Sequence, residues 1–312
     1  MSALNMATAA SFQDYIRDFA PQLLSKAYVG FTSAQLFIPH EGVKGQLILT
    51  ELTVADLARR YSSTFAPIAN AIDFDPRTLL VKKAKVDLAI VPADFESAYL
   101  GMFRQKGQNF KDLPFEAFIM DKIMAKLQSE QEAAVWKGAA AGSPASTDKL
   151  IALFDGIREI IKDEITATNL TPVATGALTA TNCVSAVETT HAALGDAYHD
   201  VTVDIFMNSK DKIKFVQDYR ERYGKYYQAA DGTVTLETGN AVFHFSAHVP
   251  TNCILITPKE NIHYGYDGPM DDSMFNFIDA PRTIQMWMDF YMGVNFGIVS
   301  NDIIAVNNQW TV

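Results

Sequence analysis

The sequence predicts an α+β fold, and three stretches of the chain lead to this prediction. A stretch that ends at Gly138 has the apolar spacing of a single helix of roughly 25 residues, about twice the usual length. The chain after it alternates helical and extended patterns, which indicates a compact α/β domain. Near the C-terminus, one segment alternates apolar and polar residues with strict period two. We therefore expect an elongated subunit with the long helix as its backbone.

The composition is that of an ordinary globular protein. The chain has 312 residues, 48% of them hydrophobic, so about two domains with a sizeable core are expected. The 36 acidic and 26 basic residues leave a formal net charge of −10, which argues against sequence-specific DNA or RNA binding. The first ten residues lack a signal-peptide pattern, and no apolar run reaches the length of a membrane span. We expect a soluble protein without a membrane partner.

Residues 1–44 are expected to form an N-terminal arm. Apolar residues recur at helical spacing from Phe12 to Leu24, although Pro21 interrupts the run, and residues 31–38 have an extended pattern. Two interpretations remain open: the helix packs on the core of its own chain, or it lies along a neighbouring subunit. The second predicts that Phe12 and Phe19 contact another subunit.

Residues 45–95 are expected to form an extended loop. Residues 46–53 and 77–91 are two extended stretches around a more helical or irregular insert, and strand-forming residues of the second stretch are interrupted by Lys82, Lys83 and Lys85. A long charged hairpin is poorly suited to burial in one small domain. We therefore expect it to project, and the three lysines to contact another subunit.

The long helix falls within residues 96–145. Asp112 can cap it, Pro114 is tolerated in its first turn, and an apolar stripe with period four follows. Trp136 lies near the end of the helix and Gly138 is the expected residue after it. We expect Trp136 and Gly138 to have structural roles, with the Trp136 ring anchoring the helix end in the core.

Residues 146–254 are expected to be the α/β domain. Helical stripes occur at residues 150–161 and 184–194, and residues 201–207 alternate as a strand. Ser209 is expected to cap a further helix that stops at Gly224, and residues 241–247 and 253–257 follow as strands. Residues 255–312 are expected to return to the β-rich domain, where Gly293 has a structural role beside the apolar residues 294–299.

The chain contains no recognisable catalytic, cofactor or metal-binding motif. Glycine-rich phosphate loops, metalloprotease motifs and nucleophile elbows are missing from the sequence. His244 and His248 share the spacing of one strand face, but no third ligand lies nearby, so two half-exposed strand residues are the simpler interpretation. The acidic loop that holds Asp267 lacks the spacing of a calcium site, and Cys183 and Cys253 are expected to be buried thiols in a protein made in a reducing cytosol. We predict neither a metal nor a cofactor, and no enzymatic activity.

The C-terminal segment resembles the end of tailed-bacteriophage major capsid proteins. In that family an apolar strand precedes an N-x-x-x-G turn, an acidic loop, a long alternating strand and an apolar Gly-Val finish, as residues 253–267 and 292–299 do here. Residues 132–138 and 154–157 are similar to the end of the family's spine helix and the start of its axial domain. Residues 206–210 and 222–224 resemble the strand-to-helix passage in that domain.

The resemblance implies an architecture and a function. The fold would be that of a tailed-phage major capsid protein, with an N-terminal arm, an extended β-hairpin loop, a peripheral domain built on the spine helix and an axial α/β domain. Copies would assemble as pentamers and hexamers into the icosahedral head that encloses double-stranded DNA, without sequence-specific DNA binding. The protein would be part of the virion, made in the cytoplasm of a bacterial host.

Several partners and alternatives remain open. Portal and decoration proteins are possible partners. The arm begins too early to leave room for a cleaved scaffolding segment, so either a separate scaffolding protein serves or the sequence is already processed, and Met1 favours the first. An encapsulin-type nanocompartment shell, which shares the fold, is the first alternative. The second is an α/β enzyme, for which the sequence offers no nucleophile with a paired base.

Overall fold

The computed structural model describes most of the chain and divides it into two compact units. The described residues are 9–54, 58, 60–61, 63, 72–91, 115–142, 149–224, 236, 241–268 and 275–311. The first unit, called here the helix–sheet unit, comprises Met1–Lys44, Val81–Asp155 and Tyr264–Gly293. The second, the α/β unit, comprises Gly45–Leu80, Gly156–His263 and Val294–Val312. Among the described residues, no helix has both the length and the apolar character needed to cross a membrane.

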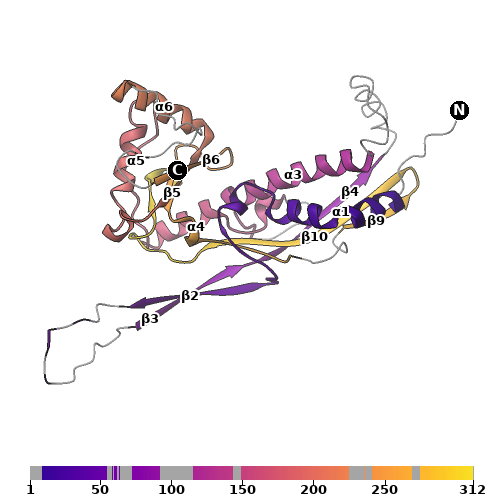
Figure 1. The fold of residues 1–312 in the computed structure, drawn as a ribbon, viewed down its shortest axis with the longest axis horizontal. Helices are drawn as coiled ribbons and strands as arrows, with labels where there is room; N and C mark the ends of the chain where they lie inside the picture. Colours follow the sequence, from indigo (N-terminus) through magenta and orange to yellow (C-terminus); the bar gives the residue numbers. More distant parts are fainter. Residues whose placement is uncertain are drawn as a thin grey trace. The chain divides into compact units, whose positions relative to one another are not determined.

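The helix–sheet unit combines two long helices with most of a five-stranded sheet (Figure 1). The strand order is β1-β8-β10-β4, and β9 also pairs with β10. The elements are α1 (Ala9–Val29), η1 (Ser33–Gln35), β1 (Ile38–His40), β4 (Lys82–Ile90), α3 (Phe115–Lys137), η2 (Leu150–Ala152), β8 (Ile262–Tyr266), β9 (Phe275–Ala280) and β10 (Thr283–Phe296). Helix α1 packs against α3 and β9.

The two faces of this sheet differ because β10 alternates strictly, as its sequence predicts. Met286, Met288 and Phe290 are at most 1% exposed, whereas the residues between them face solvent. Met286 pairs with Phe277 of β9, and Phe12 of α1 stacks on Phe277 with ring centroids 5.2 Å apart. One face is thus covered by the chain itself, and the other is open.

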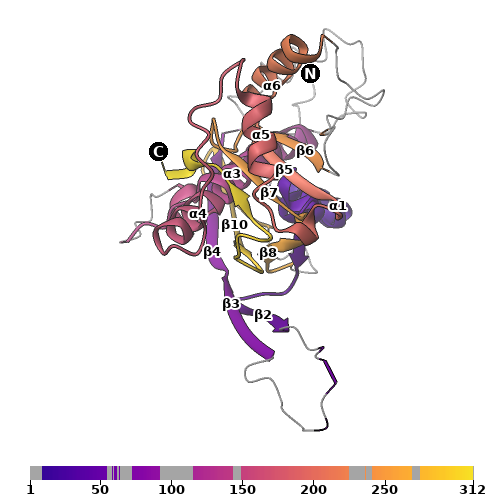
Figure 2. The same ribbon diagram turned by 90° about the vertical axis from the view of Figure 1, so that its left-hand side faces the viewer.

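The α/β unit is built on a four-stranded sheet with the order β11-β7-β5-β6 (Figure 2). Strand β5 pairs parallel to β6 and antiparallel to β7. Its elements are α4 (Ile157–Thr166), α5 (Cys183–His191), η3 (Asp196–Tyr198), β5 (Val203–Asn208), α6 (Ser209–Tyr223), β6 (Ala241–Ser246), β7 (Ile254–Thr257), η4 (Lys259–Asn261), β11 (Ala305–Val306) and η6 (Asn308–Thr311). Every residue of β5 and β7 is buried, and α5 and α6 share one apolar core with this sheet. The expectation of a compact α/β domain is confirmed.

A separate hairpin belongs to the α/β unit. Strands β2 (Gln46–Val54) and β3 (Ile72–Leu80) run antiparallel along their whole length and pair with no other described strand. The predicted extended stretch 77–91 is divided at Val81, because β4 leaves the hairpin and pairs with β10. The expectation that Lys82, Lys83 and Lys85 lie on the hairpin is therefore wrong: all three lie on β4, in the five-stranded sheet.

The C-terminal boundary also needs correction. Residues 255–312 were expected to belong wholly to the β-rich domain. Instead, β7 and β11 pair with each other inside the α/β unit, and the chain from Val294 onward groups with that unit. The apolar residues of these short strands complete the α/β core, which is why the chain re-enters it.

Several helix predictions are confirmed and several are corrected. The long helix is 23 residues long and ends at Lys137, and α6 ends at Gly224, whose φ of 63° suits glycine. Helix α1 continues through Pro21, since a proline removes one hydrogen bond and packing of the helix on α3 and β9 compensates for it. The stripe at 150–161 is split into η2 and α4, and the side chain that caps α6 is Asn208 in place of Ser209.

Some sequence predictions lie outside the described residues. They are the caps at Asp112 and Pro114, the hairpin insert at 64–71 and residues 92–95 of the expected loop.

Candidate functional site

A buried polar cluster fixes the end of α3 to the segment that follows α1. Trp136 is fully buried, and its Nε1 donates to Ser33 Oγ at 2.7 Å and to Glu132 Oε1 at 3.1 Å. The Glu132 carboxylate also accepts from the Ser33 hydroxyl at 2.6 Å and from the Ser33 backbone N–H at 3.0 Å. Phe37 packs edge-on against the Trp136 indole, with ring centroids 6.1 Å apart. The predicted burial of Trp136 in the core is confirmed.

Gly138 directly follows α3 and is buried. Its N–H continues the helical pattern by donating to the Ala134 carbonyl at 2.8 Å, and its φ is not among the positive values found in the described chain. Gly293 is buried within β10, which runs through it without a break. The structural roles of both glycines stay predictions.

The arm is bound to its own chain. Gln131 Nε2 of α3 donates to the Ala27 carbonyl at 2.8 Å, and Lys26 Nζ lies 3.0 Å from Asp121 Oδ1. Phe12 is fully buried, so the structure supports the interpretation in which this helix packs on its own core. Phe19 is 40% exposed and remains available to a neighbour. A subunit contact through either ring stays a prediction.

The open face of the five-stranded sheet has an apolar centre with ion pairs beside it. Trp287 is 39% exposed between Asn276 of β9 and Asp87 of β4, and Ile278 is 52% exposed on the same face. We call this surface, with Trp287 and Ile278 at its centre, the open sheet face. It is uncovered by any described element, and its large apolar side chains make it a candidate contact surface.

The three predicted lysines lie on β4 at this same sheet. Lys83 Nζ is 2.8 Å from Asp289 Oδ2, and Lys85 Nζ is 2.6 Å from Asp87 Oδ2. These hydrogen bonds and charges raise the pKa of both lysines, so they stay cationic. Lys82 is exposed at the start of the strand. The sequence correctly predicted their exposure but not the element that holds them.

One face of the hairpin is also open. Leu49 and Leu79 are buried on one face, while Ile48 and Leu80 on the other are 58% and 51% exposed. The described positions of this open face carry no charge: they are Gln46, Ile48, Thr50, Pro76, Thr78 and Leu80. An uncharged strip with exposed aliphatic side chains is typical of a surface that another molecule covers.

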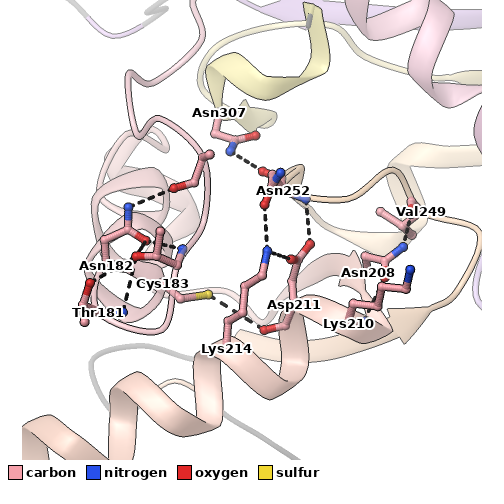
Figure 3. A network of polar contacts seen from close by, with 12 residues as sticks. Thr181, Asn182, Cys183, Asn208, Lys210, Asp211, Lys214, Val249, Asn252 and Asn307 are labelled. Carbon is pink, nitrogen blue, oxygen red and sulfur yellow. Dashed lines mark hydrogen bonds and ion pairs between the residues drawn. The ribbon is translucent and has the colours of Figure 1, made fainter.

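A polar network fixes loops around α6 at one end of the α/β unit (Figure 3). The carboxylate of Asp211, which is fully buried, accepts from Lys214 Nζ and from the Asn252 backbone N–H, each at 2.7 Å. Lys214 Nζ also donates to Asn252 Oδ1 at 2.8 Å, and Asn307 Nδ2 donates to the Asn252 carbonyl at 2.8 Å. Asn252 has a φ of 65°, a conformation that asparagine tolerates better than most residues. The network holds the β6–β7 loop against α6 and the C-terminal segment.

Asn208 extends this network at the start of α6. Its Oδ1 accepts from the Lys210 N–H at 2.8 Å and caps the helix, while its Nδ2 donates to the carbonyls of Ala247 and Val249. A single side chain thus terminates β5, starts α6 and holds the turn after β6.

Asp218 joins α5 and α6. Its Oδ2 accepts from the Val184 N–H at 2.7 Å, in the first turn of α5, and its Oδ1 lies 2.8 Å from Arg222 Nε. Burial raises the pKa of the adjacent Cys183 thiol to about 12, and the carboxylates of Asp211 and Asp218 add to the shift. A thiol with this pKa is a poor nucleophile, as expected for a buried structural cysteine.

His244 is hydrogen-bonded to an aspartate of the neighbouring strand. His244 Nε2 lies 2.6 Å from Asp204 Oδ1, and Asp204 Oδ2 accepts from the Lys259 N–H at 3.0 Å. In the described part of the chain, no group of three His, Cys, Asp or Glu side chains is placed to hold a metal ion. Asp267 of the predicted acidic loop lies 3.4 Å from Lys44 Nζ.

An open cavity of about 550 Å³ lies in the α/β unit beside the hairpin. Its lining is mainly apolar, with Leu49, Tyr198 and Ile298 among the residues. Its polar lining residues are Thr50, Tyr198, Glu260, Asn261 and His263. Asn261 uses its amide group on the Ile298 backbone, at 2.8 and 3.0 Å.

The contact surfaces described above include residues that sequence reasoning missed. For Trp287 and Ile278 the sequence did contain a signal. Trp287 stands at a position of the alternating strand where a polar residue is expected. For Ile48 and Leu80 the sequence contained no such signal, because both strands of the hairpin carry apolar residues at positions that point to either face. Asn208 and Asn252 also had no distinctive pattern around them.

Comparison with known proteins shows similarity in fold without similarity in sequence. No protein-family model and no curated protein matches the chain. A chain of the satellite phage P4 procapsid, which includes the size determination (Sid) protein, is 11% identical with a TM-score of 0.56, over 93% of this chain and 98% of that chain. The capsid of the empty GTA particle is 14% identical with a TM-score of 0.54, over 91% of this chain and 90% of that chain. A chain of Gordonia phage Cozz is 11% identical with a TM-score of 0.53, over 88% and 85% of the two chains. The chain therefore has the phage capsid fold that its sequence predicted.

Proposed function

We propose that this chain is the major capsid protein of a tailed phage, and that its copies assemble as pentamers and hexamers into the icosahedral head around double-stranded DNA. The observation that carries the proposal is the shared fold over nearly the full length of both chains. A capsid protein needs no catalytic centre. Its function rests instead on several surfaces.

We assign the parts of the chain as follows. The helix–sheet unit is the peripheral domain, with α3 as its spine helix and residues 1–44 as its arm. The α/β unit without the hairpin is the axial domain, which meets its copies around the five-fold and six-fold axes. The hairpin of β2 and β3 is the extended loop. These assignments change the ranges expected from the sequence for the extended loop (45–95), the axial domain (146–254) and the C-terminal return to the peripheral domain (255–312), because the strand pairings place their ends elsewhere.

The open surfaces support assembly. The open sheet face and the open hairpin face each present exposed aliphatic or aromatic side chains that a lone subunit leaves in water. Such surfaces are typical of proteins whose final state is an assembly. The polar network around Asp211 and Asn252 keeps the loops of the axial domain in one conformation, which repeated contacts around an axis require.

Other partners follow from this function. We propose that a separate scaffolding protein, a portal and decoration proteins act on the assembled shell, and that the packaged DNA is enclosed without sequence-specific contacts. The net charge of −10 is compatible with a wall that lies near DNA without gripping it. The protein would reside in the virion after synthesis in the host cytoplasm.

The direct test is electron microscopy of the purified full chain at neutral pH, combined with light scattering. Closed shells, or rings of five and six subunits, are the expected result. If the chain stays monomeric, the experiment is repeated with candidate scaffolding proteins, and a monomer even then would contradict the proposal. Shells that enclose an enzyme in place of DNA would favour the encapsulin alternative.

A further inference from the structure

The described contacts that hold the hairpin in its unit lie at its root. Because β2 and β3 pair only with each other among the described strands, no backbone ladder fixes the direction in which they leave the unit. An isolated two-stranded hairpin has little stability of its own. Leu49 and Leu79 are buried at the root, and the next inward-facing position on β3 is Arg77, which is opposite Leu49. Among the described side chains on the inward face of β3, Arg77 lies farthest from the root.

Arg77 is bound by an acceptor that is already positioned. Its Nη2 lies 2.6 Å from Glu164 Oε1 of α4, and the two side chains are only 20% and 14% exposed. The other carboxylate oxygen of Glu164 accepts from Asn169 Nδ2 at 2.7 Å, in the turn that ends α4. The Asn169 N–H also donates to the Glu164 carbonyl at 2.9 Å. This turn holds the carboxylate in the position where Arg77 meets it.

A second contact lies at the adjacent residue. Asn295 Nδ2, from the end of β10, donates to the Thr78 carbonyl at 2.8 Å. Consecutive residues of β3 are thus held by α4 and by β10. These two contacts define a pivot, beyond which the described hairpin has no further polar tie to its unit.

The Arg77 side chain also has a feature that makes the ion pair at the pivot easier to break. Nε of Arg77 is buried without a hydrogen-bond acceptor in the described structure, and an unpaired buried donor is unfavourable. A hairpin direction that exposes the guanidinium would lose the ion pair but would hydrate Nε. The free-energy difference between the two directions is therefore smaller than the ion pair alone would give.

We propose that the Arg77–Glu164 ion pair sets the direction of the hairpin, and that its breakage allows one chain to occupy positions of different curvature in the shell. The inference rests on the proposed capsid function, in which identical subunits serve both pentamers and hexamers. Arg77 and Glu164 would then act as positioning residues that determine shell size. With the ion pair removed, the hairpin would sample several directions and shells of more than one diameter would form.

The test uses Glu164→Gln, Arg77→Glu and the charge-swapped double variant Arg77→Glu/Glu164→Arg of the full chain. Glu159→Gln is the matched control, since Glu159 lies on the same helix and pairs with Lys162 at 2.7 Å without touching the hairpin. Hydrogen exchange of the unassembled chain should accelerate about tenfold in β2 and β3 for the single variants, as expected for loss of a partly buried ion pair, while α4 stays protected. The double variant should regain much of the protection.

Shell diameters, measured by electron microscopy, supply the second readout. The single variants should give a broad or shifted distribution, and the control and the double variant should match the wild type. Unchanged hairpin exchange, or faster exchange with unchanged diameters, would overturn the inference while leaving the capsid function intact. If the wild type forms no shells even with candidate scaffolding proteins, the proposed function fails and the size role fails with it. Exchange on the free chain still reports whether the ion pair holds the hairpin. Loss of protection in α4 as well would show a folding defect and also count against the inference.

Discussion

Trp136 and Trp287 lie in the same helix–sheet unit but in opposite surroundings. Trp136 is fully buried, and its indole N–H is bound by Ser33 and Glu132. Trp287 is 39% exposed on a sheet face that no described element covers. The contrast separates two tasks of one unit: the Trp136 cluster joins the segments that fold, and the open sheet face is free to meet another molecule. Residue type does not distinguish these tasks, but burial does.

The sharpest way to test this contrast is truncation of each ring. Trp136→Ala should lower the free energy of unfolding by about 3–5 kcal/mol, because it leaves a cavity and removes the donor to Ser33 and Glu132. Denaturant unfolding followed by circular dichroism measures the change. Trp287→Ala is the matched control and should cost roughly 1 kcal/mol or less. Equal losses for the two variants would show that the open face contributes to the fold as much as the core does.

The carboxylate in the buried cluster should have the next largest effect. Glu132→Ala leaves the Ser33 N–H without its acceptor inside the core, and we expect a loss of about 2–3 kcal/mol. The control is Glu130→Ala on the same helix, which removes only an exposed ion pair with Lys126 and should cost about 0.5 kcal/mol or less. A Glu132 variant as stable as its control would mean that water replaces the lost acceptor and that the cluster does not fix the helix end.

Much of the fold could be predicted because period and length of the apolar pattern are local properties. The 23-residue α3, the alternation of β10 and the end of α6 at Gly224 all follow from residues close in sequence. The split at Val81 could not be predicted in this way. Residues 77–91 form one extended stretch in pattern, and only the distant partner β10 decides that its second half leaves the hairpin.

The candidate surfaces were predicted less well, for a related reason. Trp136 was identified because a tryptophan near a helix end is a strong local signal. Phe12 has the same spacing in a core helix and in an arm that binds a neighbour, and its partner Phe277 is 265 residues away in the chain. Exposed apolar residues such as Ile48 and Leu80 differ from buried Leu49 and Leu79 only in which face the rest of the chain covers. That choice depends on tertiary packing.

The open sheet face should affect assembly much more than folding. The double variant Trp287→Ser/Ile278→Ser removes the exposed apolar centre, and we expect a change of about 1 kcal/mol or less in the free energy of unfolding. Shell yield in sedimentation should fall at least tenfold if this face is buried between subunits, since central aromatic residues dominate interface energies. Full yield with normal stability would remove this face from the assembly contacts and leave the hairpin face as the main candidate.

Charge reversal on β4 should have the smallest effect on stability. The variant with Lys82, Lys83 and Lys85 all changed to Glu places acidic residues beside Asp289 and Asp87, but all of these groups are exposed and screened by salt. We expect a nearly unchanged melting temperature in 0.15 M salt and impaired shell formation, as the sequence predicted. The reason is now different: Lys83 and Lys85 lie on the open sheet face, Lys82 is exposed at the start of the same strand, and none of the three lies on the hairpin.

A control with the same change in net charge is needed for this variant. Lys44, Lys122 and Lys126 are also exposed in the helix–sheet unit, and their joint change to Glu alters the total charge equally. Because a general increase in negative charge would weaken assembly in both variants alike, only a larger defect from the β4 set indicates a local contact. Equal defects would assign the effect to net charge, and a collapse of the melting temperature in the β4 variant alone would mean that its exposed ion pairs hold the sheet together.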